Sequence, residues 1–184
     1  MIDTTTLHKP LSIDEIDFRI QSIFPNGWAI LLAYKDARVD MNRLNSVFGV
    51  GGWQRRHEII NGNLYCSVGV WNKDINQWCW VQDVGTESNT EKQKGQASDS
   101  FKRACFNLGI GIELYDYPSI FVKLNDDEYE KTAGKPKQTN KLKLKQWKWH
   151  SQFDGPKLVV LLAKDHNGTR RFTFDERKET TCSQ

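Results

Sequence analysis

The chain has 184 residues and a formal net charge of +3, and 38% of its residues are hydrophobic. No apolar run approaches the ~20 residues of a membrane-spanning helix, and the N-terminal residues show no basic segment followed by an apolar stretch. We therefore expect a cytoplasmic protein rather than a membrane or secreted one. The length fits one main core with a small appendage.

Sequence patterns for metal or nucleotide chemistry are missing. The four cysteines form no CxxC pair, and the four histidines show no HxH or HxxxH spacing, so no metal site is predicted. The sequence also contains neither a GxxxxGK[ST] phosphate loop nor a GxGxxG turn. We therefore expect no cofactor and no nucleotide hydrolysis.

The charge is distributed unevenly along the chain. Residues 1–130 carry 13 Lys/Arg against 18 Asp/Glu, a balance of −5, while residues 131–184 carry 13 against 5, a balance of +8. Such asymmetry indicates an anionic partner such as nucleic acid, although a solubilising linker would show the same pattern.

Three elements are predicted in the first 52 residues. Ser12 and Glu15 have the spacing of a capping box, which predicts a helix to about Phe24. The apolar run WAILLAY, residues 28–34, has the length of a buried strand. Apolar residues then recur at helical spacing over 36–48, and the glycines of 49–52 end this second helix.

A three-stranded meander is predicted next. Two extended runs, 53–60 and 63–71, meet at Asn61-Gly62, a pair suited to a two-residue type I′ turn. The register that pairs Ile60 with Asn63 places Arg55 and Arg56 on opposite faces of the ribbon. A third strand at 77–83 completes the meander.

A long helix should follow the meander. Residues 90–93, TEKQ, form another capping box that opens a helix containing QASDSFKRACFNLGIG, residues 96–111. Lys94 and Lys102 flank its apolar stripe, and Gly109 ends it. The stripe that should pack against the meander consists of Ala97, Phe101, Ala104, Cys105 and Leu108.

The basic tail divides into three predicted segments after a core of residues 1–125: a linker at 126–140, a small β-rich module at 141–178 and a tail at 179–184. Lysines alternate with aromatic residues at the start of the module, a pattern typical of proteins that contact single-stranded nucleic acid. The alternation of lysine with leucine in this segment also fits a half-buried edge strand protected by lysines. These residues are Lys141, Lys143, Lys145, Trp147, Lys148 and Trp149.

Four landmarks together carry a family resemblance: WAILLAYKDARV, FGVGGW, the meander end VQDVG, and QASDSFKRACFNLGIGIELYDYP. They are similar to the Rad52 superfamily of single-strand annealing proteins, especially its small bacterial and phage members, over residues 12–118. The resemblance implies an α+β fold with a strand and helix followed by an antiparallel three-stranded meander packed on a long helix. The small β module would be an addition to that core.

The resemblance also implies the site. The motif SDSFKRA, residues 98–104, matches the family signature whose basic pair holds the single-stranded DNA backbone, which implicates Lys102 and Arg103 and, from the preceding segment, Arg38. Arg55, Arg56, Lys94 and the tail residues named above complete the predicted DNA-binding set. Val50 and Phe106 depart from the family pattern, since relatives have an aromatic residue and an arginine there.

The function that follows is ATP-independent single-stranded DNA binding and strand annealing in homologous recombination and DNA repair, in a bacterial or phage-infected cell. The resemblance implies self-assembly into a ring or filament, and it implies no enzyme. A single-strand-binding or replication protein is a further candidate partner.

Two alternatives stay open at this point. One is a metal-dependent nuclease, because Asp154, Asp165, Glu176 and Lys178 loosely match a D…ExK arrangement. The other is an accessory protein whose basic tail docks a protein partner rather than DNA.

Overall fold

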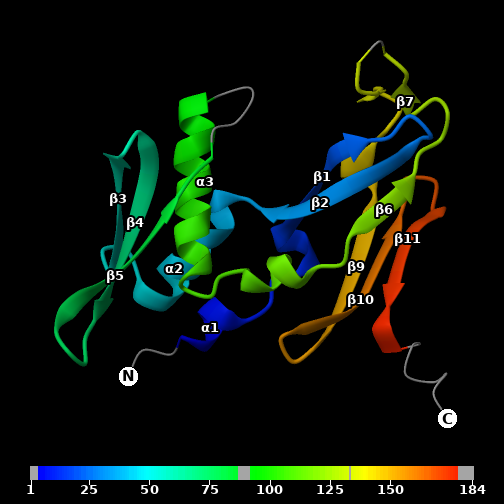
Figure 1. Ribbon diagram of the computed structural model, residues 1–184. Helices are drawn as coiled ribbons and strands as arrows, with labels where there is room; N and C mark the ends of the chain where they lie inside the picture. The colour runs from blue at the N-terminus through cyan, green and yellow to red at the C-terminus, as the bar shows by residue number, and fades with distance from the viewer. Residues whose placement is uncertain (1–3, 87–91, 133, 178–184) are drawn as a thin grey trace. The chain divides into compact units, whose positions relative to one another are not determined.

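The computed structural model describes residues 4–86, 92–132 and 134–177. They form a mixed α+β chain whose sheets are antiparallel where their pairing is resolved (Figure 1). The chain folds as two compact units. Unit 1 takes the described part of Met1–Leu11 and Lys35–Ile112, and unit 2 takes that of Ser12–Tyr34 and Glu113–Gln184.

This division differs from the predicted core, linker and module. Residues before position 125 supply Ala29, Leu31 and Val122 to the same hydrophobic cluster that contains Trp147 and Leu161 from the tail. The strands at 28–35 and 120–123 therefore pack with the C-terminal strands.

Unit 1 is built on the predicted meander. Its sheet has the order β3-β4-β5, formed by Trp53–Ile60, Asn63–Asn72 and Gln77–Val84. The predicted register is confirmed, since Ile60 pairs with Asn63 and Arg56 with Ser67. Asn61 and Gly62 both have positive φ, as a type I′ turn requires.

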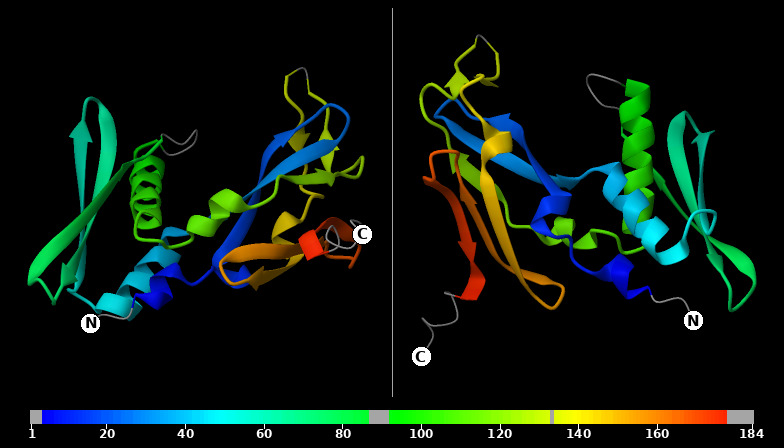
Figure 2. Two further views of the ribbon diagram at one scale, coloured as in Figure 1. Left: turned by 60° about the horizontal axis from the view of Figure 1, so that its bottom comes forward. Right: turned by 180° about the vertical axis from the view of Figure 1, so that it is seen from behind.

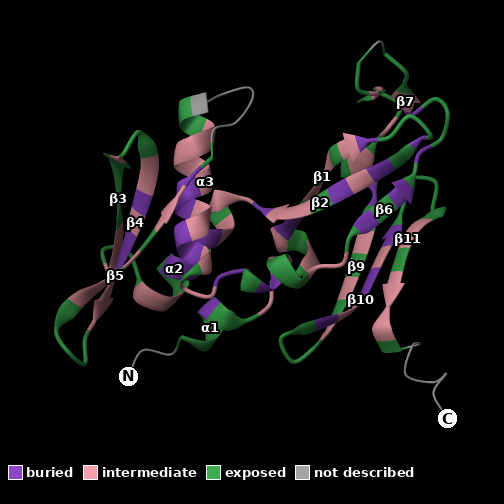
Figure 3. Cartoon of the chain, in the orientation of Figure 1, coloured by how far each residue is buried: buried purple, intermediate pink, exposed green. Residues whose placement is uncertain are grey.

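The helix α3, Lys92–Phe106, packs on this sheet (Figures 1 and 2). Phe101, Ala104 and Cys105 of its predicted stripe are buried against Cys66 and Val68 of β4. Figure 3 shows buried positions on both α3 and β4, whereas β3 is exposed or half-buried throughout. Residues 90 and 91 of the predicted capping box lie outside the described residues.

Gly85, directly after β5, allows the chain to approach α3 closely. A Cβ at this position would lie 2.2 Å from the carbonyl oxygen of Gln96 and 2.7 Å from the backbone nitrogen of Ser100. Any larger side chain would push the end of β5 away from α3. The glycine after the meander is therefore required by packing rather than by backbone conformation.

Two further helices complete unit 1: α1, Thr5–His8, and α2, Ala37–Phe48. The predicted second helix is confirmed, with Asp36 as its N-cap accepting a hydrogen bond from the backbone nitrogen of Arg38. Arg43 of α2 is buried, and its guanidinium donates to the carbonyl oxygens of Thr6, Lys9 and Pro10. This contact ties the α1 segment to α2.

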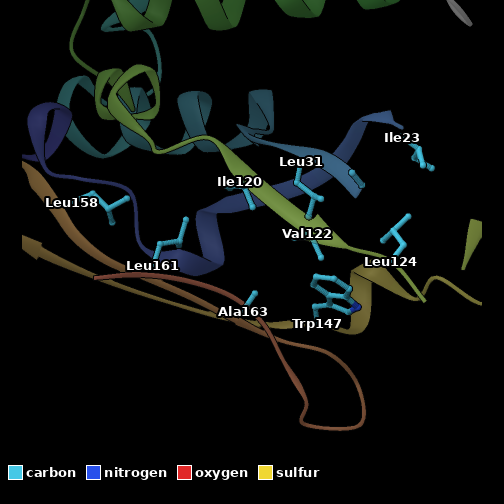
Figure 4. Packing of buried hydrophobic residues seen from close by; sticks show 10 residues of the cluster. Ile23, Leu31, Ile120, Val122, Leu124, Trp147, Leu158, Leu161 and Ala163 are labelled. Carbon is cyan, nitrogen blue, oxygen red and sulfur yellow. The ribbon is translucent and has the colours of Figure 1, made fainter. Parts of the chain in front are cut away.

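Unit 2 packs two three-stranded sheets around one core. One sheet has the order β1-β2-β6, from Ile16–Ile23, Trp28–Lys35 and Ile120–Lys123; the other has the order β11-β10-β9, from Arg170–Asp175, Lys157–Lys164 and Lys148–Asp154. Lys35, the last residue of β2, belongs to unit 1. Figure 4 shows Leu31 and Val122 of the first sheet in the same core as Leu161 and Ala163 of β10.

The prediction of a helix from Ser12 to about Phe24 is wrong. Glu15 does accept a hydrogen bond from the backbone nitrogen of Ser12, but the turn is only the 3₁₀ segment η1, Ile13–Glu15, and strand β1 follows it. Ile16, Phe18 and Ile20 alternate with polar residues at a period of two, and pairing with β2 outweighs the local helix signal.

The predicted linker and the lysine-rich segment also differ from expectation. Within 126–140, β7 (Tyr129–Glu130) pairs with β8 (Lys137–Gln138). Residues 144–146 form a 3₁₀ turn, η3, Leu144–Gln146, rather than an edge strand. Another 3₁₀ segment, η2, covers Ile112–Asp116. None of the described helices has the length and apolar character needed to cross a membrane.

Candidate nucleic-acid interface

The predicted basic pair lies on α3, but its two members have different neighbours. Arg103 is 38% exposed, and its Nε atom lies 3.2 Å from Oδ1 of Asp83 on β5. The carboxylate holds the guanidinium beside the sheet while part of it stays accessible to solvent. Arg103 therefore has a fixed direction from which it can donate to an anion.

Lys102 instead exerts an electrostatic effect on Asp36, the N-cap residue of α2. Hydrogen bonds from Arg38 hold the pKa of Asp36 below its usual value, and the charge of Lys102 lowers it further. Arg38 is exposed, and its Nε atom lies 2.8 Å from Oδ1 of Asp36. Lys102 and Arg38, two of the three cations that the family resemblance implicates, therefore both lie close enough to Asp36 to lower the pKa of its carboxyl group.

A buried ion pair lies behind this surface. Lys35, 1% exposed, donates to Oδ1 of Asp40, which is fully buried, and to the carbonyl oxygen of Ile110. Burial raises the pKa of Asp40 to about 6, against the opposing effect of Lys35 and of the more distant Lys102. The pair joins the end of β2 to α2 and to the residues after α3.

Phe106 completes this cluster. Its ring centroid lies 4.1 Å from Nζ of Lys35, a cation–π contact. Relatives are expected to have an arginine at this position, and here the aromatic ring instead covers a buried lysine that comes from β2. Val50, the other departure, is 96% exposed in the turn after α2.

The arginines of β3 lie on opposite faces, as predicted. The Arg55 guanidinium is 4.8 Å from the ring centroid of Phe101 on α3, whereas that of Arg56 is 4.6 Å from the ring of Trp80 on the other face. Both side chains are exposed. Lys94 is exposed near the beginning of α3. We use the name α3 site for Lys102, Arg103, Arg38, Arg55 and Lys94.

The tail lysines lie in unit 2, and the tryptophans beside them belong to its interior. Trp147 is 6% exposed, and the guanidinium of Arg171 lies 4.7 Å from its ring centroid, so the structure leaves little of the ring accessible for the predicted stacking on a base. Trp149 is half-buried and stacks on Phe18 with ring centroids 3.5 Å apart. Lys141, Lys143, Lys145 and Lys148 are exposed.

Two carboxylates of the nuclease alternative, those of Asp165 and Glu176, are engaged by other contacts, and the third, Asp154, is exposed. Oδ1 of Asp165 accepts from the backbone nitrogens of Asn167 and Thr169, and Oδ2 accepts from Arg171 at 3.1 Å. Glu176 pairs with Lys157 at 2.7 Å. Within the described ranges no three His, Cys, Asp or Glu residues are grouped so as to hold a metal ion. Lys178 lies outside those ranges.

The charged residues of structural importance that the sequence did not reveal include Lys35 and Arg171. Arg171 is buried and reaches Glu128 at 2.6 Å as well as Asp165. Lys35 follows an apolar strand directly, which is a weak signal for a buried cation. Arg171 shows no such signal, since its partner Glu128 is 43 positions away in the chain.

Cations exposed on one helix recur in proteins that contact a nucleic-acid backbone. Comparison with known proteins gives the family. The model of the Rad52/22 family of double-strand break repair proteins matches residues 4–133. The chain belongs to this family.

Several curated proteins are similar in sequence. The single-stranded DNA-binding protein DdrA of Deinococcus deserti is 30% identical over 141 residues, which cover 65% of this chain and 66% of the relative. DdrA of Deinococcus radiodurans is 28% identical over 137 residues, or 63% and 62% of the two chains. The mitochondrial genome maintenance protein MGM101 of Eremothecium gossypii is 29% identical over 146 residues, or 74% and 53%. The chain thus spans slightly less than two thirds of the DdrA relatives.

Proposed function

We propose that this chain binds single-stranded DNA through the α3 site and promotes annealing of complementary strands in homologous recombination and DNA repair, without ATP. The observation that carries the proposal is the position of Lys102 and Arg103 on an accessible helix within the part of the chain that matches the Rad52/22 family. The printed names of the DdrA relatives, single-stranded DNA-binding proteins, support it.

The chemistry of the site suits a phosphate backbone. Arginine offers a planar fork of donors that matches phosphate oxygens, and lysine adds a point charge. Asp36 and Asp83 form ion pairs with Arg38 and Arg103, and both arginine side chains stay accessible to solvent. Binding through the backbone carries no sequence information, as a protein that anneals arbitrary strands requires.

We also propose that copies of the chain assemble into a ring or filament in a bacterial or phage-infected cell. One α3 site offers few phosphate contacts, so its affinity for DNA alone should be low. Repetition of the site along one strand converts later contacts into intramolecular ones and raises the overall affinity. Electron microscopy with and without single-stranded DNA tests this assembly.

The proposal is tested by reversing the charge of the basic pair. We expect Lys102→Glu/Arg103→Glu to weaken binding of an oligo-dT strand by more than tenfold and to abolish annealing, because attraction to phosphate becomes repulsion. The matched control is Lys73→Glu/Lys164→Glu, which changes the net charge equally at two exposed positions outside the α3 site. If the α3 variant is folded and binds like the control, the assignment of this site is wrong.

A further inference from the structure

Unit 2 contains a groove beside strand β1. The groove has a volume of about 790 Å³, and residues from two distant parts of the chain line it. One wall is the consecutive β1 segment 18–23, at the edge of the sheet β1-β2-β6. The other wall comes from residues 135–138 and 142–146, which include β8 and η3. We call this feature the β1 groove.

The lining of the β1 groove carries charge of one sign. No carboxylate is among the residues that line the groove. Apart from Tyr34, its ionisable residues are the five cations Arg19, Lys135, Lys137, Lys143 and Lys145. All five side chains are exposed, and within the part of the chain that the structure describes none of them forms an ion pair. Other cations of the tail are paired, including Lys157 with Glu176 and Arg177 with Asp175.

The walls of the groove are held by contacts within unit 2. Phe18 stacks on Trp149 with the ring planes 5° apart, and the Arg19 guanidinium lies 5.9 Å from the ring centroid of Tyr34. On the opposite side, Thr139 donates to the carbonyl oxygens of Asp127 and Glu128, which fixes the chain after Lys137. The lysines therefore project from a supported surface, while the Phe18 ring is engaged in protein packing.

We propose that the β1 groove binds the phosphate backbone of single-stranded nucleic acid as a second contact surface of this chain, in addition to the α3 site. The inference rests on the proposed function, because it assigns a further part of the same ligand. A cationic groove that tracks the backbone is a recurring solution for binding single strands without reading their sequence. Four of the five cations in the groove are lysines, whose ammonium groups act as point charges on flexible stems.

The β1 groove is lined by residues from segments that were predicted to be separate parts of the chain. Lys143 and Lys145 were predicted to contact DNA together with neighbouring tryptophans. The structure instead groups these lysines with Arg19 from the N-terminal part and with Lys135 and Lys137 from the predicted linker. The ligand chemistry changes accordingly, from base stacking to contact with phosphate oxygens.

The test compares the full-length wild-type chain with Lys143→Glu/Lys145→Glu and with the control Lys73→Glu/Lys164→Glu. We expect the groove variant to bind an oligo-dT strand at least tenfold more weakly than the control at moderate salt. The slope of log K against log salt should become shallower by about 1.4, or ~0.7 for each phosphate that is no longer neutralised by a lysine. Thermal unfolding should be unchanged, because both lysines are exposed.

Three results would overturn the proposal. If wild type binds the strand and the groove variant matches the control in affinity and slope, the groove assignment is wrong and the α3 site is unaffected. If the groove variant keeps DNA affinity but loses binding of a polyglutamate peptide that wild type retains, the groove serves an acidic protein segment instead. If wild type binds no single strand, the proposed function and the groove assignment are both wrong.

Discussion

The α3 site and the β1 groove are both cationic, but their cations have different surroundings. In the α3 site Arg103 contacts Asp83, Arg38 contacts Asp36, and Arg55 lies over the Phe101 ring. In the groove, Lys143 and Lys145 project into a lining that contains no carboxylate. The first arrangement fixes the direction of Arg103 and Arg38, while Asp83 and Asp36 compete with a ligand for these two donors. The second leaves the lysines without a carboxylate among the residues that line the groove.

This difference has a consequence for binding. Donors of fixed direction favour short, directed hydrogen bonds to phosphate oxygens. Mobile lysines contribute mainly through counterion release, which depends steeply on salt. We therefore expect the α3 site to supply the directed contacts and the β1 groove to supply a larger salt-dependent share for each cation.

The largest expected effect is on the stability of unit 2, through the ion pairs of Arg171 with Glu128 and Asp165. Arg171→Leu should lower the stability of unit 2 by about 3–5 kcal/mol, because it leaves the carboxylates of Glu128 and Asp165 buried without their cation. Hydrogen exchange should show loss of protection in β10 with little change in β4. Equal protection of β10 in wild type and variant would contradict the structural role of Arg171.

The next effect concerns the buried pair behind the α3 site. Lys35→Met should destabilise unit 1 by about 3 kcal/mol, because Asp40 is then buried without its partner. Lys35→Met/Asp40→Leu should recover most of that loss, since both charges are gone. Denaturant unfolding of the single and double variants measures the coupling. A double variant no more stable than Lys35→Met would argue against the pair.

A smaller effect is expected from pH. Burial raises the pKa of Asp40 to about 6, so between pH 7 and 5 the folded chain takes up a proton that the unfolded chain does not bind. This group's contribution to the free energy of unfolding should therefore increase by roughly 1–2 kcal/mol as the pH falls through this window. The comparison is with Asp40→Asn, which should lack this component. Identical pH profiles for the two proteins would contradict the assignment.

The smallest expected effect is on DNA affinity, and it comes from removing the acid that competes with DNA for Arg103. Asp83→Asn removes the carboxylate beside Arg103, so binding of oligo-dT should become a few fold tighter. Asp126→Asn, at an exposed position of unit 2, is the control for the change in net charge. Unchanged affinity relative to this control would show that Asp83 does not compete with the ligand.

Local signals predicted unit 1 well. The Asn61-Gly62 turn set the register of β3 and β4, and the spacing of Phe101, Ala104 and Cys105 indicated the buried side of α3. These predictions succeeded because the turn and the helical period act between near neighbours in the chain.

Unit 2 depended on distant contacts, and there the sequence was less informative. The hydrogen bond between Ser12 and Glu15 formed as expected, yet pairing with β2 made residues 16–23 a strand. Trp147 looked like a base-stacking residue until the packing of two sheets placed it in their shared core. The β1 groove could not be predicted either, because its cations come from segments more than 100 positions apart.

The most direct measurement is the salt dependence of single-strand binding by three variants of equal net charge, altered in the α3 site, in the β1 groove or at the control positions. The account predicts that the α3 variant loses binding at all salt concentrations, whereas the groove variant binds more weakly with a shallower slope and the control keeps the wild-type slope. If all three variants show the same affinity and slope, binding follows net charge alone and neither surface is a specific site.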